Sequence, residues 1–192
     1  MKKSNLPVFP IGIVVLPGTI QSLQIFEPRY IDMVKKCLKD KVGFVIVFQK
    51  KFSSEDDYEI SKKGSYVEII DFNNLPNGLL GITVKAINKV SINNLTQLHD
   101  GLNIAETAPI VDPEVDDQAL LAEFSEIKNI LSQLVKHPKI IDMPLNIDFN
   151  SADSVVYHLA GLIPIPRTHK QSLLEAFDAR SEERRVGKEC ER

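Results

Sequence analysis

The chain has 192 residues, 43% of them hydrophobic and 26% charged, with a net charge of -3 and a sequence pI of about 5.8. This length fits one ordinary domain or two small lobes that share an interface, and the composition is that of a soluble globular protein and not of a disordered one. A mildly acidic chain lacks the basic footprint of a duplex-DNA binder.

The sequence shows no sign of export or of membrane insertion. No apolar run approaches the ~20 residues of a membrane-spanning helix, and the N-terminal lysines precede a proline-broken stretch and not the continuous apolar segment of a signal peptide. Cys37 and Cys190 are far apart in sequence, so no disulfide framework is expected. We therefore expect a cytoplasmic protein without membrane contact.

Short apolar segments dominate the first 110 residues. The run 7–16 ends at the turn pair Pro17–Gly18, after which Leu23 and Ile25 alternate with polar residues in a half-buried strand. Segment 43–49 is apolar without alternation, as in a strand buried on both faces. Further strands are predicted at 65–72, 79–92 and 102–110. Many short strands at this spacing favour a barrel or rolled sheet.

The segment Glu27-Pro28-Arg29-Tyr30 predicts a joint between a strand and a helix. Pro28 fits a first helical turn, and Glu27 before it is expected to accept a hydrogen bond from a free N–H. Arg29 either ties loop carbonyls or a carboxylate, or is a surface charge. The alternative, Glu27 as a general acid or base beside Arg29, needs further converging polar groups. The helix that follows has one apolar face, formed by Tyr30, Met33, Val34, Cys37 and Leu38.

The acidic, proline-containing segment 111–118 predicts a boundary between two lobes. We expect a β-rich lobe at 1–112, a helical lobe at 113–180 and a charged tail at 181–192. The tail has no apolar face to bury, so it is expected to be disordered.

The helical lobe shows three helical patterns. Apolar residues from Leu120 to Leu134 recur in steps of three and four, and segment 150–162 is a helix with Ser151 or Asp153 as N-cap. Thr168 and Gln171 have the spacing of a capping box for a last helix. Leu173, Leu174 and Phe177 of that helix are expected to face the core.

Segment 9–34 resembles the opening signature of the Lon protease N-terminal domain family, also called the Lon substrate-binding domain. Segments 100–106 and 159–178 are similar to later parts of the family, so the resemblance extends to about Arg180, although residues 181–192 abandon the apolar spacing of the family's last helix. The matching residues of the opening signature, which we interpret as structural, are Phe9, Pro10, Pro17, Gly18, Ile25, Phe26, Glu27, Pro28, Arg29 and Tyr30.

The resemblance implies an α+β fold: an N-terminal β-rich, PUA-like pseudo-barrel with one amphipathic helix, followed by a C-terminal helical lobe. It also implies a non-catalytic protein-binding module that recognises exposed apolar or unfolded polypeptide segments, with protease or chaperone machinery as a partner. Neither a Walker A sequence nor Gly-x-Ser-x-Gly is present, so the chain resembles a standalone form of the domain. We expect no catalytic residues, metal or cofactor; the peptide-binding residues stay unassigned, with the groove between the lobes as the expected place.

Two other functions are less favoured by the sequence. A PUA-like lobe is compatible with RNA binding by a patch of lysines, but the overall acidity favours lysines that solvate helix and loops, so nucleic acid is not the expected partner. An enzyme lacks a converging catalytic set: Ser125 and Lys128 have Ser-x-x-Lys spacing without its partner motifs, and His99, His137, His158 and His169 show no ligand spacing for zinc. The lysines of the patch are Lys35, Lys36, Lys39, Lys41, Lys50, Lys51, Lys62 and Lys63.

Overall fold

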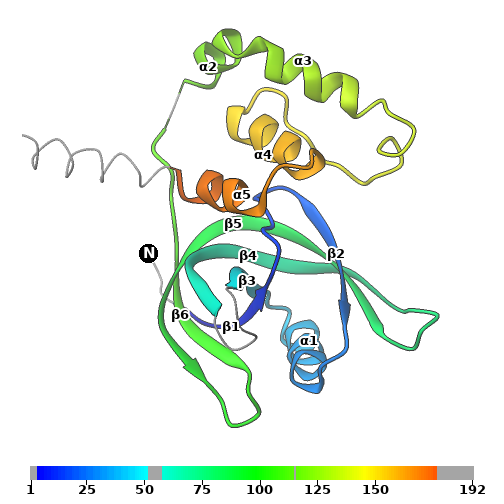
Figure 1. Cartoon of the computed structure of the whole chain (residues 1–192), viewed down its shortest axis with the longest axis vertical. Coiled ribbons are helices and arrows are strands. Elements are labelled where there is room, and N and C mark those ends of the chain that lie inside the picture. Colours follow the sequence, from blue (N-terminus) through cyan, green and yellow to red (C-terminus); the bar gives the residue numbers. More distant parts are fainter. Residues whose placement is uncertain (1–3, 52–57, 115, 177–192) are drawn as a thin grey trace, which may run out of the picture.

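The computed structural model describes residues 4–51, 58–114 and 116–176 (Figure 1). Its sheet has the strand order β2-β5-β4-β3-β1-β6, and an additional pairing of β5 with β6 closes all strands except β2 into a barrel. The strands are β1 (Ser4–Ile11), β2 (Ile20–Ile25), β3 (Phe44–Lys51), β4 (Tyr58–Asn74), β5 (Leu80–Gln97) and β6 (Asn103–Pro109). The helices are α1 (Pro28–Asp40), α2 (Asp117–Glu123), α3 (Ser125–Leu134), α4 (Ala152–Leu162) and α5 (Arg167–Glu175).

Strand β2 lies outside the closed barrel. Its pairing with β5 runs from Ile20 opposite Lys85 to Ile25 opposite Leu80, so it covers only the first part of that long strand. Leu23 and Ile25 are buried whereas the polar residues beside them are exposed, which confirms the predicted half-buried strand. Within the described chain β2 is an edge strand, and an edge strand has unpaired backbone groups on its outer side.

Strand β3 has apolar neighbours on both of its faces. Phe44 and Ile46 belong to one apolar cluster, which α1 completes, and Val45 and Val47 belong to a second cluster with β1, β5 and β6. Such a strand needs no alternation of polar and apolar residues, so the prediction for 43–49 is confirmed. Helix α1 buries Tyr30, Met33, Val34 and Cys37, which confirms four of the five residues of its predicted apolar face; Leu38 is half-buried.

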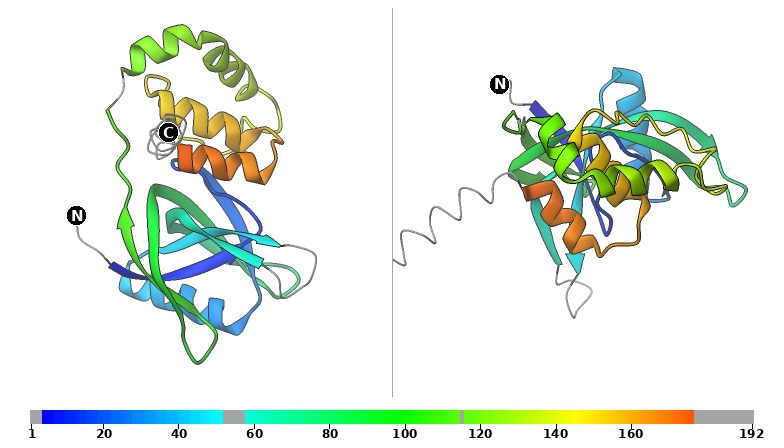
Figure 2. Two further views of the ribbon diagram at one scale, coloured as in Figure 1. Left: turned by 60° about the vertical axis from the view of Figure 1, so that its left-hand side comes forward. Right: turned by 90° about the horizontal axis from the view of Figure 1, so that it is seen from above.

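Helices α2 to α5 form a layer on the side of the barrel opposite α1 (Figures 1 and 2). They are held to the β part by a third cluster, in which Leu16 packs against Tyr157, Ala160 and Leu174. The predicted continuous helical stripe from Leu120 to Leu134 is instead two helices with a break at Phe124. Leu131 is the only residue of these two helices that is buried, since both lie on the outside of the layer.

The predicted capping box in the last helix is wrong. Helix α5 begins at Arg167 after Pro166, without a side-chain hydrogen bond at its N-cap. Gln171 is buried, and its Nε2 donates to the Lys63 carbonyl oxygen at 3.2 Å and to Glu175 at 2.6 Å. The amide that was expected to cap the helix therefore ties α5 to β4.

The α+β fold class is confirmed, with a β-rich first part and helices after it. Strand β6 ends at Pro109 and α2 begins at Asp117. The predicted tail at 181–192 and Phe177 lie outside the described residues. None of the helices in the described ranges combines the length and the apolar character needed to cross a bilayer.

Candidate binding cleft

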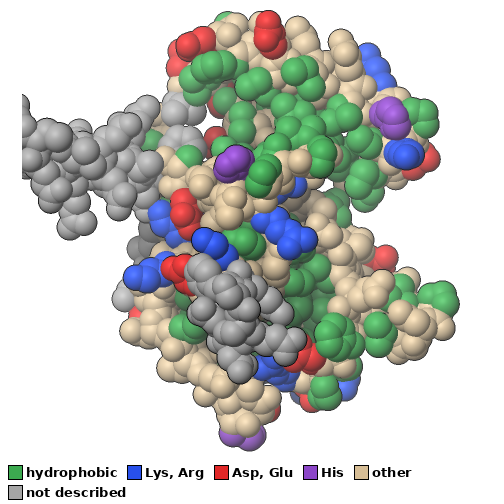
Figure 3. Space-filling view, in the orientation of Figure 1, with side chains coloured by type: hydrophobic (Ala, Val, Ile, Leu, Met, Phe, Trp, Pro, Cys, Tyr) green, Lys and Arg blue, Asp and Glu red, His purple; other side chains and the backbone are tan. Residues whose placement is uncertain are grey.

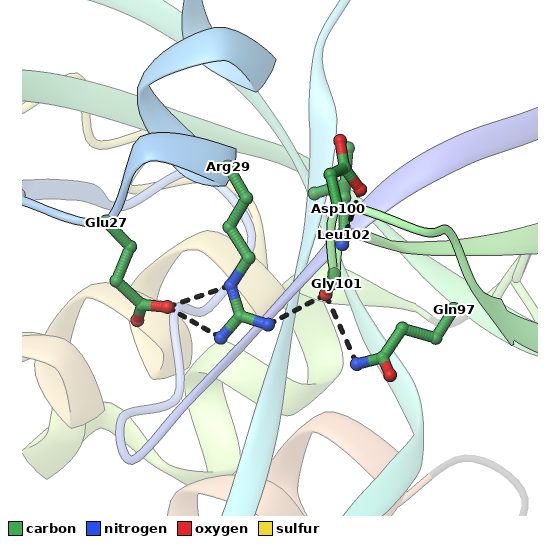
Figure 4. A network of polar contacts seen from close by, with 6 residues as sticks. All are labelled: Glu27, Arg29, Gln97, Asp100, Gly101 and Leu102. Carbon is green, nitrogen blue, oxygen red and sulfur yellow. Dashed lines mark hydrogen bonds and ion pairs between the residues drawn. The ribbon is translucent and has the colours of Figure 1, made fainter.

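The Glu-Pro-Arg-Tyr segment fastens α1 to the hairpin between β5 and β6 (Figure 4). Arg29 Nε donates to Glu27 Oε2 at 2.8 Å, and its Nη1 donates to the Gly101 carbonyl oxygen at 2.7 Å. Glu27 occupies the N-cap position, but its side chain makes no cap hydrogen bond, so that prediction is wrong: the carboxylate binds the guanidinium instead. Of the roles that the sequence left open for Arg29, the structure shows contacts with both a loop carbonyl and a carboxylate and not a free surface charge.

The turn of the hairpin between β5 and β6 is also held by defined hydrogen bonds. Gly101 has a positive φ of 83°, and Gln97 Nε2 also donates to its carbonyl at 3.2 Å. Asp100 accepts a hydrogen bond from the backbone N–H of Leu102 at 2.9 Å, which fixes the turn. We therefore propose a structural role for Glu27 and Arg29, because each of their contacts stabilises the joint.

The other signature residues fall in different environments. Phe9 is 7% exposed and packs on Tyr30 with ring centroids 4.3 Å apart. Pro10 is half-buried in β1, and Pro28 is exposed at the first position of α1. Phe26 is 66% exposed, so it contributes nothing to the core.

A cleft of about 500 Å³ lies between the sheet and the helical layer; we call it the main cleft. Its floor is the outer face of β2, β5 and β4, where Ser22, Thr83 and Asp71 are cross-strand neighbours in one row. Its opposite wall comes from α4, α5 and the connection that carries Met143. Three segments that are distant in sequence thus meet at one open surface.

Exposed apolar side chains form part of the rim of the main cleft. Ile70 on β4 is 49% exposed and Met143 is 45% exposed, and Leu145 and Leu162 extend this surface inward. Figure 3 shows hydrophobic side chains gathered over the helical layer on the face it presents. Exposed apolar side chains above a polar floor suit a ligand that offers both apolar groups and backbone hydrogen-bonding groups.

A second cavity of about 300 Å³, which we call the side pocket, adjoins the main cleft at His158 and is also lined by Gly18. Gly18 has a φ of 80°, and a Cβ at this position would lie 3.1 Å from His158 Cε1. His158 lines both cavities and is 2% exposed. The glycine of the Pro17–Gly18 turn therefore permits close packing against α4.

The imidazole of His158 has a defined tautomer. Its Nδ1 lies 2.7 Å from the Ser154 carbonyl oxygen, which only accepts, so Nδ1 carries the proton. In the neutral ring Nε2 is then an acceptor, and it has no hydrogen-bond partner among the described residues. Tyr157 also lines the side pocket. Its hydroxyl is buried and has no hydrogen-bond partner among the described residues.

Burial shifts the pKa values of several groups around the cavities. Burial lowers the pKa of Lys170, which lines the main cleft. Burial, with the nearby carboxylates of Asp112 and Asp117, raises the pKa of Asp153, and the cation of Lys89 opposes this shift. Burial also raises the pKa of the Tyr157 hydroxyl. Tyr157 is buried and the other two groups are partly shielded from water, and polar interactions are strengthened where water is excluded.

A third, almost wholly apolar cavity of about 240 Å³ lies among the helices and is lined by Phe124, Val155, Leu173 and Ala176. Ala176 is the last described residue before Phe177, so this cavity borders the part of the chain that the structure leaves undescribed. The main cleft is lined by described residues, and it is the candidate site.

The residues of the main cleft were not predictable from the sequence. A groove was expected between the lobes without named lining residues, and His158 was one of four isolated histidines. In the side pocket, Asp153 is one of two N-cap candidates for α4, and Ser151 takes that role by accepting from the Ser154 N–H. The sequence does predict the turn at Pro17–Gly18, whose two residues line the side pocket.

A barrel with a helical layer over one side defines a fold that other solved structures share. The structure of a Lon N-terminal domain protein from Xanthomonas campestris superposes with a TM-score of 0.70 at 23% identity, covering 96% of this chain and 98% of that chain. The N-terminal domain of Mycobacterium avium complex Lon protease gives a TM-score of 0.66 at 16% identity, with 90% of each chain covered.

The family model for the substrate-binding domain of ATP-dependent protease La (Lon) matches residues 5–188. The chain therefore belongs to the Lon substrate-binding domain family. A Lon protease from Halothermothrix orenii is 24% identical over 179 residues, covering 86% of this chain. The chain spans only 22% of the length of that relative.

Proposed function

We propose that the chain is a non-catalytic module that binds exposed apolar segments of unfolded polypeptides in the main cleft. Membership of the substrate-binding domain family supports a binding role. The observation that carries the finer proposal is the composition of the cleft: an apolar rim at Ile70 and Met143 above a row of polar side chains on the sheet.

The edge strand β2 adds a second source of affinity. The main cleft is lined by Thr19 to Ser22, so a segment lying in it would run beside this strand. An extended polypeptide gains main-chain hydrogen bonds when it pairs with a free strand edge, and its side chains fill neighbouring apolar pockets. Folded proteins hide both features, so such a site favours unfolded chains.

We also infer that the chain works with protease or chaperone machinery in the cytoplasm, as its family membership suggests. RNA binding is the less favoured alternative. Its candidate lysines are divided between α1, its C-cap Lys41, and the strands β3 and β4. Lys35 is engaged by Asp32 at 2.9 Å.

Fluorescence anisotropy with a labelled, uncharged apolar peptide tests the proposal. Ile70→Asp should weaken binding about tenfold, because burying an isoleucine side chain contributes about 1.5–3 kcal/mol. Leu98→Asp is the matched control: Leu98 is 44% exposed at the hairpin turn between β5 and β6 and does not line the main cleft.

The salt dependence of binding distinguishes peptide binding from RNA binding. Binding of an uncharged peptide should hardly depend on salt, whereas RNA binding should weaken steeply as salt rises. Equal losses in Ile70→Asp and Leu98→Asp would place binding elsewhere, and RNA binding without peptide binding would overturn the proposal.

A further inference from the structure

We propose that the side pocket binds a basic side chain, arginine or lysine, of the polypeptide held in the main cleft. This inference rests on the proposed function and adds a preference for polypeptides that carry a basic side chain. It assigns Asp153 as the residue that pairs with the incoming cation.

The carboxylate of Asp153 has no hydrogen-bond or ion-pair partner among the residues that the structure describes. It is half-buried in the first turn of α4, where it lines the side pocket. A carboxylate withdrawn from water without a partner is unfavourable, and a cation that enters the pocket removes this penalty.

The charges around Asp153 are predominantly negative. Asp112 also lines the pocket, and its carboxylate is paired with Lys89 Nζ at 2.5 Å. Asp117 lies close enough to affect Asp153, and its side chain accepts the Ala152 N–H at 2.8 Å. Asp153 is therefore influenced by two further carboxylates, those of Asp112 and Asp117, and by one buried ammonium group, that of Lys89.

The second cation of the pocket does not cancel this excess. Lys85 lines the pocket from β5. Its cross-strand neighbour in the register of β4 and β5 is Glu68, on the same face of the sheet. An opposite charge at this position offsets the Lys85 ammonium, so the excess around Asp153 is left for a ligand.

Two buried polar atoms point independently to a hydrogen-bonding ligand. His158 is 2% exposed with an unpartnered Nε2 acceptor, and Tyr157 is 4% exposed with an unpartnered hydroxyl, within the described part of the chain. Both residues line the side pocket. An arginine side chain carries five N–H donors in a planar fork, enough to serve Asp153 and a second acceptor together.

The position of the pocket fits a side chain and not a separate ligand. His158 lines both cavities, so the side pocket adjoins the main cleft at this side chain. A polypeptide in the main cleft would therefore have its backbone beside β2 and could extend one long side chain past His158. Arginine and lysine are long and keep their charge at the tip.

The test compares two labelled apolar peptides that differ only in a central arginine or glutamine. With the native chain the arginine peptide should bind about tenfold more tightly, since charge-assisted hydrogen bonds are roughly twice as strong as neutral ones. Asp153→Asn should reduce this ratio to about one. Asp40→Asn, an exposed carboxylate at the end of α1, removes the same charge elsewhere and should preserve the ratio.

The outcomes are distinct. If both peptides bind the native chain equally, or if Asp153→Asn keeps the arginine preference, the side pocket has no such role while the proposed function stands. If neither peptide binds, the proposed function fails and this inference fails with it. An arginine preference that is lost in Asp153→Asn and retained in Asp40→Asn supports both.

Discussion

Phe26 and Tyr30 belong to the same short motif, yet their side chains have opposite environments. Tyr30 is 5% exposed against Phe9, while Phe26 is 66% exposed. The helical spacing places Tyr30 on the apolar face of α1, whereas nothing in the sequence predicts the environment of Phe26. The tertiary position of the motif decides, because the α1 face packs into the barrel and the residue before the helix does not.

Tyr30→Ala should therefore lower the free energy of unfolding by about 3–5 kcal/mol, the usual cost of truncating a buried aromatic residue. Urea unfolding followed by circular dichroism measures this. Phe26→Ala is the control within the motif and should change stability by less than about 0.5 kcal/mol. Similar losses in both variants would contradict the packing described for α1.

The half-buried carboxylate of Asp153 makes stability depend on pH. Burial raises its pKa in the folded state above the ordinary value of about 3.9, so the protonated form is favoured by folding. This contribution is fully present below the unfolded-state pKa and is lost as the pH rises through the folded-state pKa.

Asp153→Asn should thus be more stable than the native chain at neutral pH, and the difference should vanish below about pH 4. Thermal unfolding across this pH range measures the effect. A variant that is less stable at neutral pH would show that the carboxylate has a stabilising partner, which would also remove the basis of the side-pocket proposal.

At the scale of elements, the Pro17–Gly18 turn positions β2 against α4. Gly18 and Gly78 both have a positive φ, of 80° and 79°. Of these two glycines, only Gly18 has a neighbour within 4 Å of the place that a Cβ would take, namely His158. Comparing alanine substitutions at these two glycines therefore separates the cost of backbone strain from the cost of the contact with His158.

Both Gly18→Ala and Gly78→Ala should lose about 1–2 kcal/mol, since a left-handed backbone disfavours any residue with a Cβ. Gly18→Ala should lose more, and the excess should disappear in a His158→Ala background, as a double-mutant cycle in urea would measure. An equal loss of stability in both variants would mean that a Cβ at position 18 does not clash with His158 on α4.

Elements with strong local patterns were predictable from the sequence. The alternation in β2 and the apolar run of β3 have local causes and are predicted correctly. The cap of α4 is predicted only as Ser151 or Asp153, and the structure shows Ser151. The break at Phe124 and the buried Gln171 were not predicted, because both depend on tertiary packing. A Thr-x-x-Gln spacing does not show that the amide will reach the Lys63 carbonyl on a distant strand.

At the scale of the whole molecule, the main cleft exists only because three distant segments converge. Three parts of the chain supply its lining: Val14 to Ser22, the β4–β5 region around Ile70 and Thr83, and the segment from Met143 to Lys170. No local pattern contains this arrangement. We also propose that the barrel and the helical layer correspond to the two lobes expected from the sequence, with the cleft as their shared surface.

The most direct test of polypeptide binding in the main cleft is a backbone NMR titration of the chain with an unlabelled, extended apolar peptide. We predict that amide shifts concentrate on β2, on α4 and at 143–145, with little change on α1. Shifts confined to α1 and its lysines, or no shifts at a saturating peptide concentration, would contradict binding in this cleft.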